Sequence, residues 1–121
     1  MKSILVVDDD RDIVLGLSIR LRAAGYAVLA VQDGNAALST AINKKPDLIL
    51  MDIGIPAGNG LWVLEFLKKN ANSMLIPVVI MTGMEPVAAR EKAMALGAVE
   101  FFQKPVDNDQ LLQAIRRHVG E

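Results

Sequence analysis

The sequence contains no cysteine, and this absence excludes three kinds of chemistry. Without thiols the chain forms no disulfide bond, holds no zinc through thiolates and has no cysteine nucleophile. An excess of positive charge is also lacking, because 13 lysines and arginines face 14 acids and the net charge is -1. Binding to nucleic acid or to an anionic membrane needs a broad positive field. We therefore expect neither to be a direct partner.

Long hydrophobic runs are missing as well. Only four apolar residues, Ile4 to Val7, precede the first acidic cluster, whereas a signal peptide needs a core of ~7 to 15 residues and a spanning helix ~20. A cytoplasmic protein is the expectation. The 121 residues, 52% hydrophobic and 22% charged, suit one folded domain over residues 1–121.

Five short apolar runs alternate with five segments of helical period. Runs that are apolar throughout are typical of strands buried on both faces of a parallel sheet. The strands are expected at 4–7, 26–31, 48–51, 78–81 and 99–103, and the helices at 13–24, 34–44, 61–67, 86–96 and 108–118. Five strand-then-helix units predict an α/β fold, a doubly wound parallel sheet with helices on both faces.

Polar residues stand at the ends of the predicted strands. Asp8 and Asp9 follow the first, Asp52 the third, Thr82 the fourth and Lys104 the fifth. Sites in doubly wound sheets form outside the carboxyl ends of the strands. Because buried unpaired charge is costly, packing alone does not explain three carboxylates, a hydroxyl and an ammonium along one edge.

Carboxylates gathered in one pocket call for a cation, since two charges ~4 Å apart repel by about 4 kcal/mol at a dielectric of ~20. Oxygen ligands without thiolates favour Mg²⁺ or Mn²⁺ over zinc. An ammonium and a hydroxyl opposite the metal would hold the oxygens of a transferring phosphoryl group. Asp52 is the candidate nucleophile, because a carboxylate can form an aspartyl-phosphate.

Four segments carry a likeness to a known family: ILVVDDD (4–10), DLILMDIGIPAGNG (47–60), VVIMTG (78–83) and FFQKP (101–105). Together they resemble the receiver domain of two-component response regulators, of the chemotaxis-regulator type, over essentially the whole chain. The resemblance implies a flavodoxin-like (βα)5 fold with strand order 2-1-3-4-5. It also implies a signalling domain rather than an enzyme, phosphorylated by a sensor histidine kinase or a phosphotransfer protein.

The same resemblance implies a role for each site residue. Asp52 would be the phosphoacceptor and a metal ligand, Asp9 a direct Mg²⁺ ligand and Asp8 an acid that helps mainly through water. Gly54 would bind the metal through its backbone carbonyl. The hydroxyl of Thr82 would contact one phosphoryl oxygen.

Lys104 would pair with another phosphoryl oxygen and, before phosphorylation, with Asp52, and the resemblance implies that its peptide bond to Pro105 is cis. Phe101 falls at an aromatic switch position that remodels the face of the fourth helix, fifth strand and fifth helix. That face would pass the signal to an effector domain or protein, or form a phosphorylation-dependent homodimer. Gly54 and Met84 are less typical of the family, so the lifetime of the phosphorylated state does not follow from the likeness.

Two other functions compete with the receiver. Asp8 and Asp10 have the spacing of the nucleophile and acid of a small haloacid-dehalogenase-like phosphatase, but Asp12 replaces the hydroxyl or branched residue expected there and the chain is short. A receiver-like interaction module without phosphotransfer would keep the fold and lose a catalytic residue, whereas this set is intact. We expect Trp62 and the methionines to pack helices against the sheet, and His118 to lie on the surface at a helix end.

Overall fold

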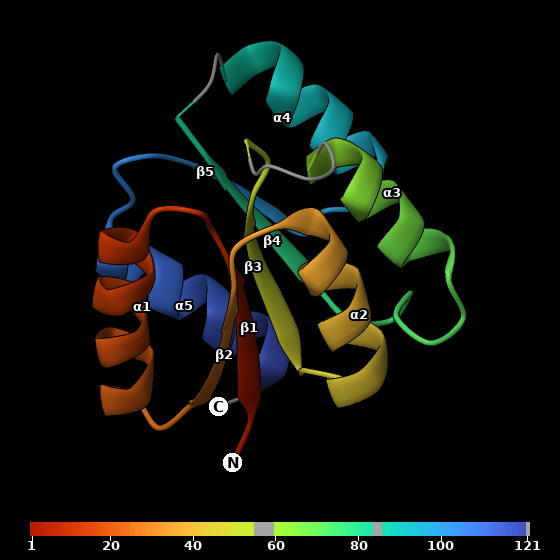
Figure 1. The fold of residues 1–121 in the computed structure, drawn as a ribbon. Coiled ribbons are helices and arrows are strands. Elements are labelled where there is room, and N and C mark those ends of the chain that lie inside the picture. The colour runs from red at the N-terminus through yellow and green to blue at the C-terminus, as the bar shows by residue number, and fades with distance from the viewer. Residues whose placement is uncertain (55–59, 84–85, 121) are drawn as a thin grey trace.

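The computed structural model describes residues 1–54, 60–83 and 86–120 and contains one parallel sheet of five strands (Figure 1). The order across the sheet is β2-β1-β3-β4-β5, which confirms the doubly wound topology expected from the sequence. The strands are β1 (Ser3–Val7), β2 (Ala27–Val31), β3 (Leu48–Asp52), β4 (Val78–Thr82) and β5 (Glu100–Gln103).

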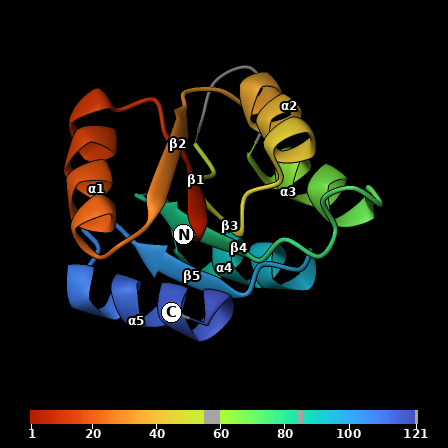
Figure 2. The same ribbon diagram turned by 90° about the horizontal axis from the view of Figure 1, so that it is seen from below.

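Five helices connect and cover the strands, each in a segment of predicted helical period. They are α1 (Arg11–Ala23), α2 (Gly34–Lys44), α3 (Gly60–Lys69), α4 (Pro86–Ala95) and α5 (Asn108–Val119). Figure 2 shows α1 and α5 on one face of the sheet and α2, α3 and α4 on the other. The sheet is thus buried between two helical layers.

The core consists of two clusters, one on each face of the sheet. Within β1, Ile4 and Val6 belong to the cluster beneath α1 and α5, whereas Leu5 and Val7 belong to the cluster beneath the other three helices. This division follows from the strand period, which sends successive side chains to opposite faces. Strands covered on both faces therefore need the uninterrupted apolar runs that the sequence shows.

Polar caps and a glycine set where several helices begin and end. Asp10, Asp33 and Asp107 are the N-caps of α1, α2 and α5, and each carboxylate accepts backbone N–H groups of the first turn. Gly25 follows α1 with φ of 97°, a left-handed conformation that glycine adopts without strain. These local devices fix the helices next to the strand ends.

Each predicted strand differs from the structure by one residue at one end, and the second and fifth strands both begin one residue later than predicted. The second strand begins at Ala27, because the Tyr26 N–H bonds to the carbonyl of Leu21 and the residue belongs to the turn after α1. The fifth strand begins at Glu100 instead of Val99. The N–H of Val99 donates to the carbonyl of Val78 in β4, so Val99 borders the β4–β5 ladder one residue before its first pair, Val79 with Glu100.

The expectation that Trp62 packs against the sheet is wrong. Its side chain is 53% exposed, because α3 turns Val63, Leu64 and Leu67 toward the core and leaves position 62 outside. The ring stacks on Phe66 one turn later, with 5.7 Å between ring centroids. The methionines divide as well: Met51 and Met81 are buried, whereas Met1, Met74 and Met94 are exposed.

Candidate functional site

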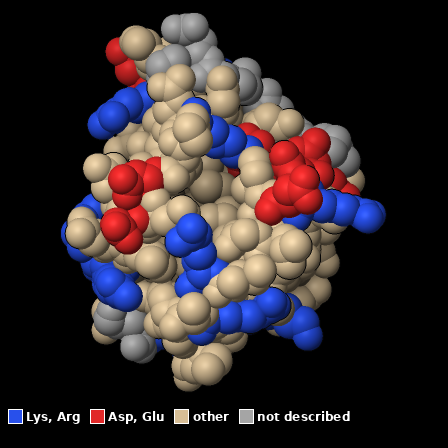
Figure 3. All heavy atoms as spheres, turned by 90° about the vertical axis from the view of Figure 1, so that its left-hand side faces the viewer, with Lys and Arg blue, Asp and Glu red and all other residues tan. Residues whose placement is uncertain are grey.

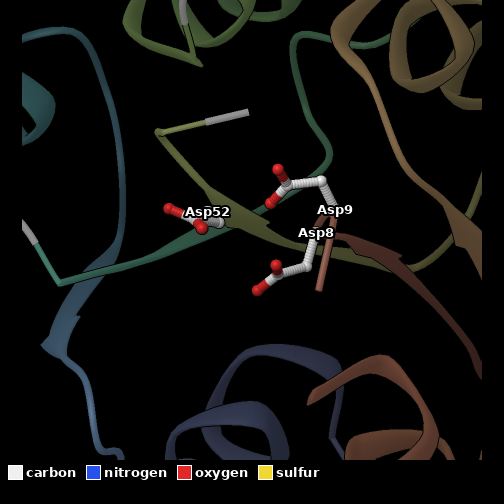
Figure 4. Close-up of side chains that lie close together, drawn as sticks. All are labelled: Asp8, Asp9 and Asp52. Carbon is white, nitrogen blue, oxygen red and sulfur yellow. The ribbon is translucent and has the colours of Figure 1, made fainter. Parts of the chain in front are cut away.

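Three carboxylates from two neighbouring strands meet at one edge of the sheet. Asp8 and Asp9 follow β1 directly, and Asp52 is the last residue of β3, which pairs with β1. One oxygen of each carboxylate lies within 4.8 Å of the others. Figure 4 shows the three side chains projecting into the same space. The sequence prediction that they converge is confirmed because parallel strands end at the same edge.

Burial and hydrogen bonding distinguish the three acids. Asp8 is fully buried and Asp52 nearly so, whereas Asp9 is exposed. Oδ1 of Asp8 accepts the backbone N–H of Asp10 at 2.9 Å, and Oδ1 of Asp52 accepts the backbone N–H of Gly54 at 2.9 Å. The loop backbone after each strand therefore orients a carboxylate and leaves its other oxygen for a cation.

Lys104 supplies that cation in the structure. Its Nζ lies 2.8 Å from Oδ2 of Asp8 and 2.9 Å from Oδ2 of Asp52, so one ammonium bridges β1 and β3. Burial lowers the pKa of Lys104, but its hydrogen bonds and attraction to the two carboxylates outweigh this, and the net pKa lies above the usual 10.5. The lysine is therefore firmly protonated at neutral pH.

The backbone around Lys104 connects the lysine to β4. Its N–H donates to the carbonyl of Thr82 at 2.8 Å, and its peptide bond to Pro105 is cis, as the resemblance implies. Thr82 itself is fully buried at the end of β4. Hydroxyl, ammonium and carboxylates thus stand at the ends of adjacent strands.

Phe101 lies apart from the acids. It is half-buried in β5, opposite Ile80 of β4, and packs against the core cluster beneath α2, α3 and α4. No polar group is needed to hold the ring there. The ring is held by apolar packing and lies outside the acidic cluster.

Gly54 leaves one side of Asp52 open. A Cβ at this position would lie 3.5 Å from Oδ1 of Asp52, so any larger side chain would begin to cover the carboxylate. The loop at 55–59, including Pro56 and Gly58 of the family-like motif, and Met84 lie outside the described residues.

Gly60 packs closely against the backbone next to Asp52. The sequence motif contains this glycine but does not show the contact. A Cβ on Gly60 would lie 2.3 Å from Cα of Ile53, the residue after Asp52, and its N–H already bonds to the carbonyl of Ile53 at 3.2 Å. Only glycine permits this approach. The start of α3 therefore packs directly against Ile53, the residue that follows the phosphoacceptor candidate Asp52.

The donor set suits a hard divalent cation. Three carboxylates and one ammonium carry a formal charge of about -2, and all the candidate ligands are oxygens. Ligands about 2.1 Å from Mg²⁺ lie roughly 3 to 4 Å from one another, and carboxylate oxygens within 4.8 Å reach that spacing by small rotations. Asp8, Asp9, Asp52 and the carbonyl of Gly54 could hold the ion.

A groove of about 440 Å³ adjoins this cluster between α1 and the chain after β5. Its walls include Ile13, Gly16 and Leu17 of α1 together with Pro105 and Val106. Lys104 also lines it, so the groove opens directly beside the acidic cluster. The groove meets the acidic cluster through Lys104, which contacts Asp8 and Asp52.

Two other polar residues are engaged outside the cluster. Oδ1 of Asp10 accepts the N–H groups of Asp12 and Ile13 as the N-cap of α1, which does not favour its use as a phosphatase acid. Nε2 of His118 lies 3.1 Å from Oε2 of Glu100, so the histidine links the end of α5 to β5.

Comparison with known proteins identifies the family. Residues 4–116 match the response regulator receiver domain. The chain is 35% identical over 115 residues to protein PilH of Pseudomonas aeruginosa, covering 95% of each chain. It is 36% identical over 113 residues to response regulator PleD of Caulobacter vibrioides, covering 93% of this chain and 25% of PleD. The chain therefore spans nearly all of one relative and a quarter of another.

Solved structures agree with this likeness over almost the whole chain. A CheY-like receiver domain protein from Methanospirillum hungatei has a TM-score of 0.92 and 28% identity, covering 99% of this chain and 94% of that one. The receiver domain of sensor histidine kinase PA1611 from Pseudomonas aeruginosa, solved with magnesium in its active-site cleft, has a TM-score of 0.90 and 27% identity, covering 99% and 98%. Sequence, fold and the acidic edge together show that this chain belongs to the response regulator receiver domain family.

Proposed function

We propose that the chain is a phosphorylatable signalling switch that accepts a phosphoryl group on Asp52 from a histidine of a sensor kinase or phosphotransfer protein. The observation that carries this proposal is the position of Asp52, whose carboxylate is bonded to Lys104 and lies within 4.8 Å of Asp8 and Asp9. Receiver domains are signalling domains rather than classical enzymes. We propose the same of this chain, with the reaction confined to its own aspartate.

The reaction needs one bond to form and one to break. An oxygen of Asp52 bonds to phosphorus as the bond from phosphorus to the donor imidazole nitrogen breaks, and that nitrogen keeps the electron pair. Negative charge is then spread over the three equatorial oxygens of the phosphoryl group. The ammonium of Lys104, which contacts Asp52, and the hydroxyl of Thr82, the last residue of β4, would each take one of these oxygens.

Asp8, Asp9, Asp52 and the Gly54 carbonyl would hold Mg²⁺ or Mn²⁺, which supplies positive charge at the developing phosphoryl oxygens. The magnesium of the PA1611 receiver supports this assignment. The ammonium of Lys104 offsets only one of the three carboxylate charges. The remaining negative charge favours binding of a metal cation in addition to the lysine.

The donor would dock over α1. The groove of about 440 Å³ has apolar walls from Ile13 and Leu17 and ends at Lys104, beside the phosphoacceptor. Gly16 also faces it and, lacking a side chain, leaves room for a helix of the donor. An apolar contact surface next to a polar site suits a protein donor.

The output would be a change in the face formed by α4, β5 and α5. The new phosphoryl group adds about -1.5 to -2 of charge near Thr82, and Phe101 lies on the neighbouring strand. Among the described side chains of α4 only Ala93 is buried, so this helix is lightly held and can shift at little cost. Moving such an equilibrium from 1:99 to 99:1 takes about 5.5 kcal/mol. The reader would be an effector domain or protein, or a second copy on this face.

No described helix is both long and apolar enough to cross a membrane. A cytoplasmic location goes with the proposal, because the phosphate donors of this reaction are themselves cytoplasmic domains.

The test is the intact mass of the protein after incubation with acetyl phosphate or phosphoramidate, with Mg²⁺ or with EDTA. We expect one phosphoryl adduct that needs the metal and disappears in Asp52→Asn, with circular dichroism confirming that the variant is folded. Stoichiometric adduct on Asp52→Asn would refute the phosphoacceptor. Folded wild type without any adduct would favour the interaction module, and steady phosphate release from unrelated esters would favour the phosphatase.

Lys104→Ala tests the coupling between the site and the output face. We expect this variant to accept some phosphoryl group yet to lose the conformational response, because the ammonium would contact a phosphoryl oxygen directly. Amide hydrogen exchange in β5 and α5 measures the response. A response equal to that of the wild type would contradict the role of the lysine.

A further inference from the structure

The outer edge of β2 carries no charged residue and no proline. β2 ends the sheet, and in the described part of the chain only β1 pairs with it. Its sequence, AVLAV, carries neither charge nor proline, the two devices by which proteins commonly prevent a free edge from pairing with another chain. An edge of this kind is a template for a further strand.

The peptide groups that face outward are identified by the bonds to β1. The N–H of Ala27 donates to Lys2 and the carbonyl of Val31 accepts from Asp8, so residues 27, 29 and 31 direct their backbone groups toward β1. The alternate residues, Val28 and Ala30, therefore direct theirs away from the sheet. These two residues lie symmetrically on either side of Leu29.

An exposed apolar pair lies on α1, the helix that covers one face of β2. Leu15 and Ile19 are 60% and 59% exposed and stand one turn apart on α1, which packs against β2. They lie on the outer surface of α1 and do not line the groove beside α5, whose walls on this helix include Gly16 and Arg20. The pair thus extends the apolar character of the edge onto one helical layer.

We propose that a second copy of this chain binds here by antiparallel pairing of β2 with β2 about a two-fold axis at Leu29. Val28 of each copy would exchange both backbone hydrogen bonds with Ala30 of the other, which gives four bonds in all. Leu15 would then meet Ile19 of the second copy, because α1 also runs antiparallel to its mate. The interface is isologous and closes as a dimer.

The face of β2 that is covered by α2 has room for Leu29 of the second copy, the residue on the two-fold axis. A groove of about 300 Å³ lies between β2 and α2, lined by Leu29, Val31, Ser39, Thr40 and Asn43 among others. Leu29 of the second copy would enter it. Apolar walls at β2 and hydroxyl or amide groups on α2 suit an interface with a polar rim.

Charge along the edge favours the antiparallel arrangement. Exposed Arg22 and Lys44 lie at the end where β2 begins, and Asp10 with Asp33 lies at the end where β2 finishes. Figure 3, which views the side of α1, shows one group of acidic side chains at the right and others at the left, with basic side chains most numerous across the centre and lower part. A two-fold axis places the basic end of each copy against the acidic end of the other.

The first experiment uses the absence of natural cysteine. In Leu29→Cys the two thiols would face each other across the axis, in a pair whose Cα atoms lie about 4.5 Å apart, within the range of a disulfide. With EDTA and no phosphate donor, we expect mild oxidation to cross-link this variant at least about tenfold faster than Leu75→Cys, because pairing raises the effective thiol concentration. Leu75 is 89% exposed and outside this surface.

Sedimentation equilibrium from about 10 μM to about 1 mM measures the association itself. We expect wild type to pass from monomer to dimer, and Ala30→Pro, which removes only outward N–H groups, to raise the Kd about tenfold or more. Ala30→Lys, at an exposed position, serves if the proline variant does not fold. A wild type that stays monomeric, or a dimer whose Leu29→Cys links no faster than Leu75→Cys, overturns the proposal; the second result would place the dimer on another face.

Discussion

Lys104 shows how a single side chain can hold the site together. It lies 96 residues from Asp8 and 52 from Asp52 in the sequence, yet its Nζ is within 2.9 Å of both carboxylates. Asp8 is fully buried, and a buried carboxylate without a partner is strongly destabilising. The lysine therefore contributes to stability before it contributes to any reaction.

Replacing Lys104 by methionine tests that contribution. We expect Lys104→Met to unfold more easily at pH 7, by about 1 to 3 kcal/mol, because two carboxylates lose their cation. The folded pKa of Lys104 is raised, so its stabilisation is complete below about pH 10.5 and fades as the pH rises through the folded pKa. Urea unfolding of both proteins at pH 7, 9 and 11 would show the difference shrinking at the highest pH. A difference that is constant with pH would contradict the ion pairs.

Two glycines with opposite surroundings make a matched pair. Gly60→Ala would force a Cβ to 2.3 Å from the backbone of Ile53, so we expect a loss of roughly 1 to 3 kcal/mol or more. At Gly16, inside α1, no atom lies within 4 Å of an added Cβ, and Gly16→Ala should stabilise by about 0.5 to 1 kcal/mol. Denaturant midpoints of both variants measure this, and equal effects would show that the approach of α3 to the loop is misplaced.

At the scale of an element, α1 separates two roles of neighbouring acids. Its N-cap, Asp10, accepts two backbone N–H groups of the first turn, whereas Asp8 and Asp9 belong to the site. The cap fixes where the helix starts. The start of the helix in turn places the groove walls Ile13 and Leu17 beside Lys104.

We expect Asp10→Ala to destabilise the protein by about 1 kcal/mol through loss of the cap, and Asp10→Asn to change stability little. Both variants should still form the Mg²⁺-dependent phosphoryl adduct, because Asp10 caps α1 and lies outside the acidic cluster. Thermal unfolding and intact mass measure the two effects. Loss of adduct in the stable Asp10→Asn variant would instead give this residue the role of an acid.

For the whole molecule, metal binding and folding are linked through Asp9. This acid is exposed, so Asp9→Asn should leave the fold unchanged while removing a ligand. We expect Mg²⁺ at 100 times its Kd to stabilise the wild type by about 2.7 kcal/mol, and to stabilise Asp9→Asn much less at the same concentration. Asp109→Asn, an exposed acid on α5, is the control that should respond as wild type does. Equal stabilisation of Asp9→Asn and wild type would place the ion elsewhere.

The sequence by itself predicted the helices and strands from their hydrophobic periods, and the polar residues at the strand ends. Apolar runs buried on both faces and helical stripes are short-range patterns, so the strands, the helices and the convergence of Asp8, Asp9 and Asp52 could be predicted. The resemblance added the strand order and the pairing of Lys104 with Asp52. The start of the second strand was predicted one residue early, at Tyr26. The backbone N–H of Tyr26 bonds to Leu21 in the turn, and a local sequence pattern does not reveal such a bond.

The tertiary structure alone decided the contacts between remote atoms. The bridge from Lys104 to two strands, the approach of Gly60 to Ile53 and the outward turn of Trp62 depend on how layers pack, which no local pattern encodes. The same holds for the edge of β2, whose AVLAV run resembles a buried strand in the sequence and becomes a free edge only through its place in the sheet. The hydrophobic period of each segment determines whether it forms a helix or a strand. The order of the strands in the sheet determines which other segments it contacts.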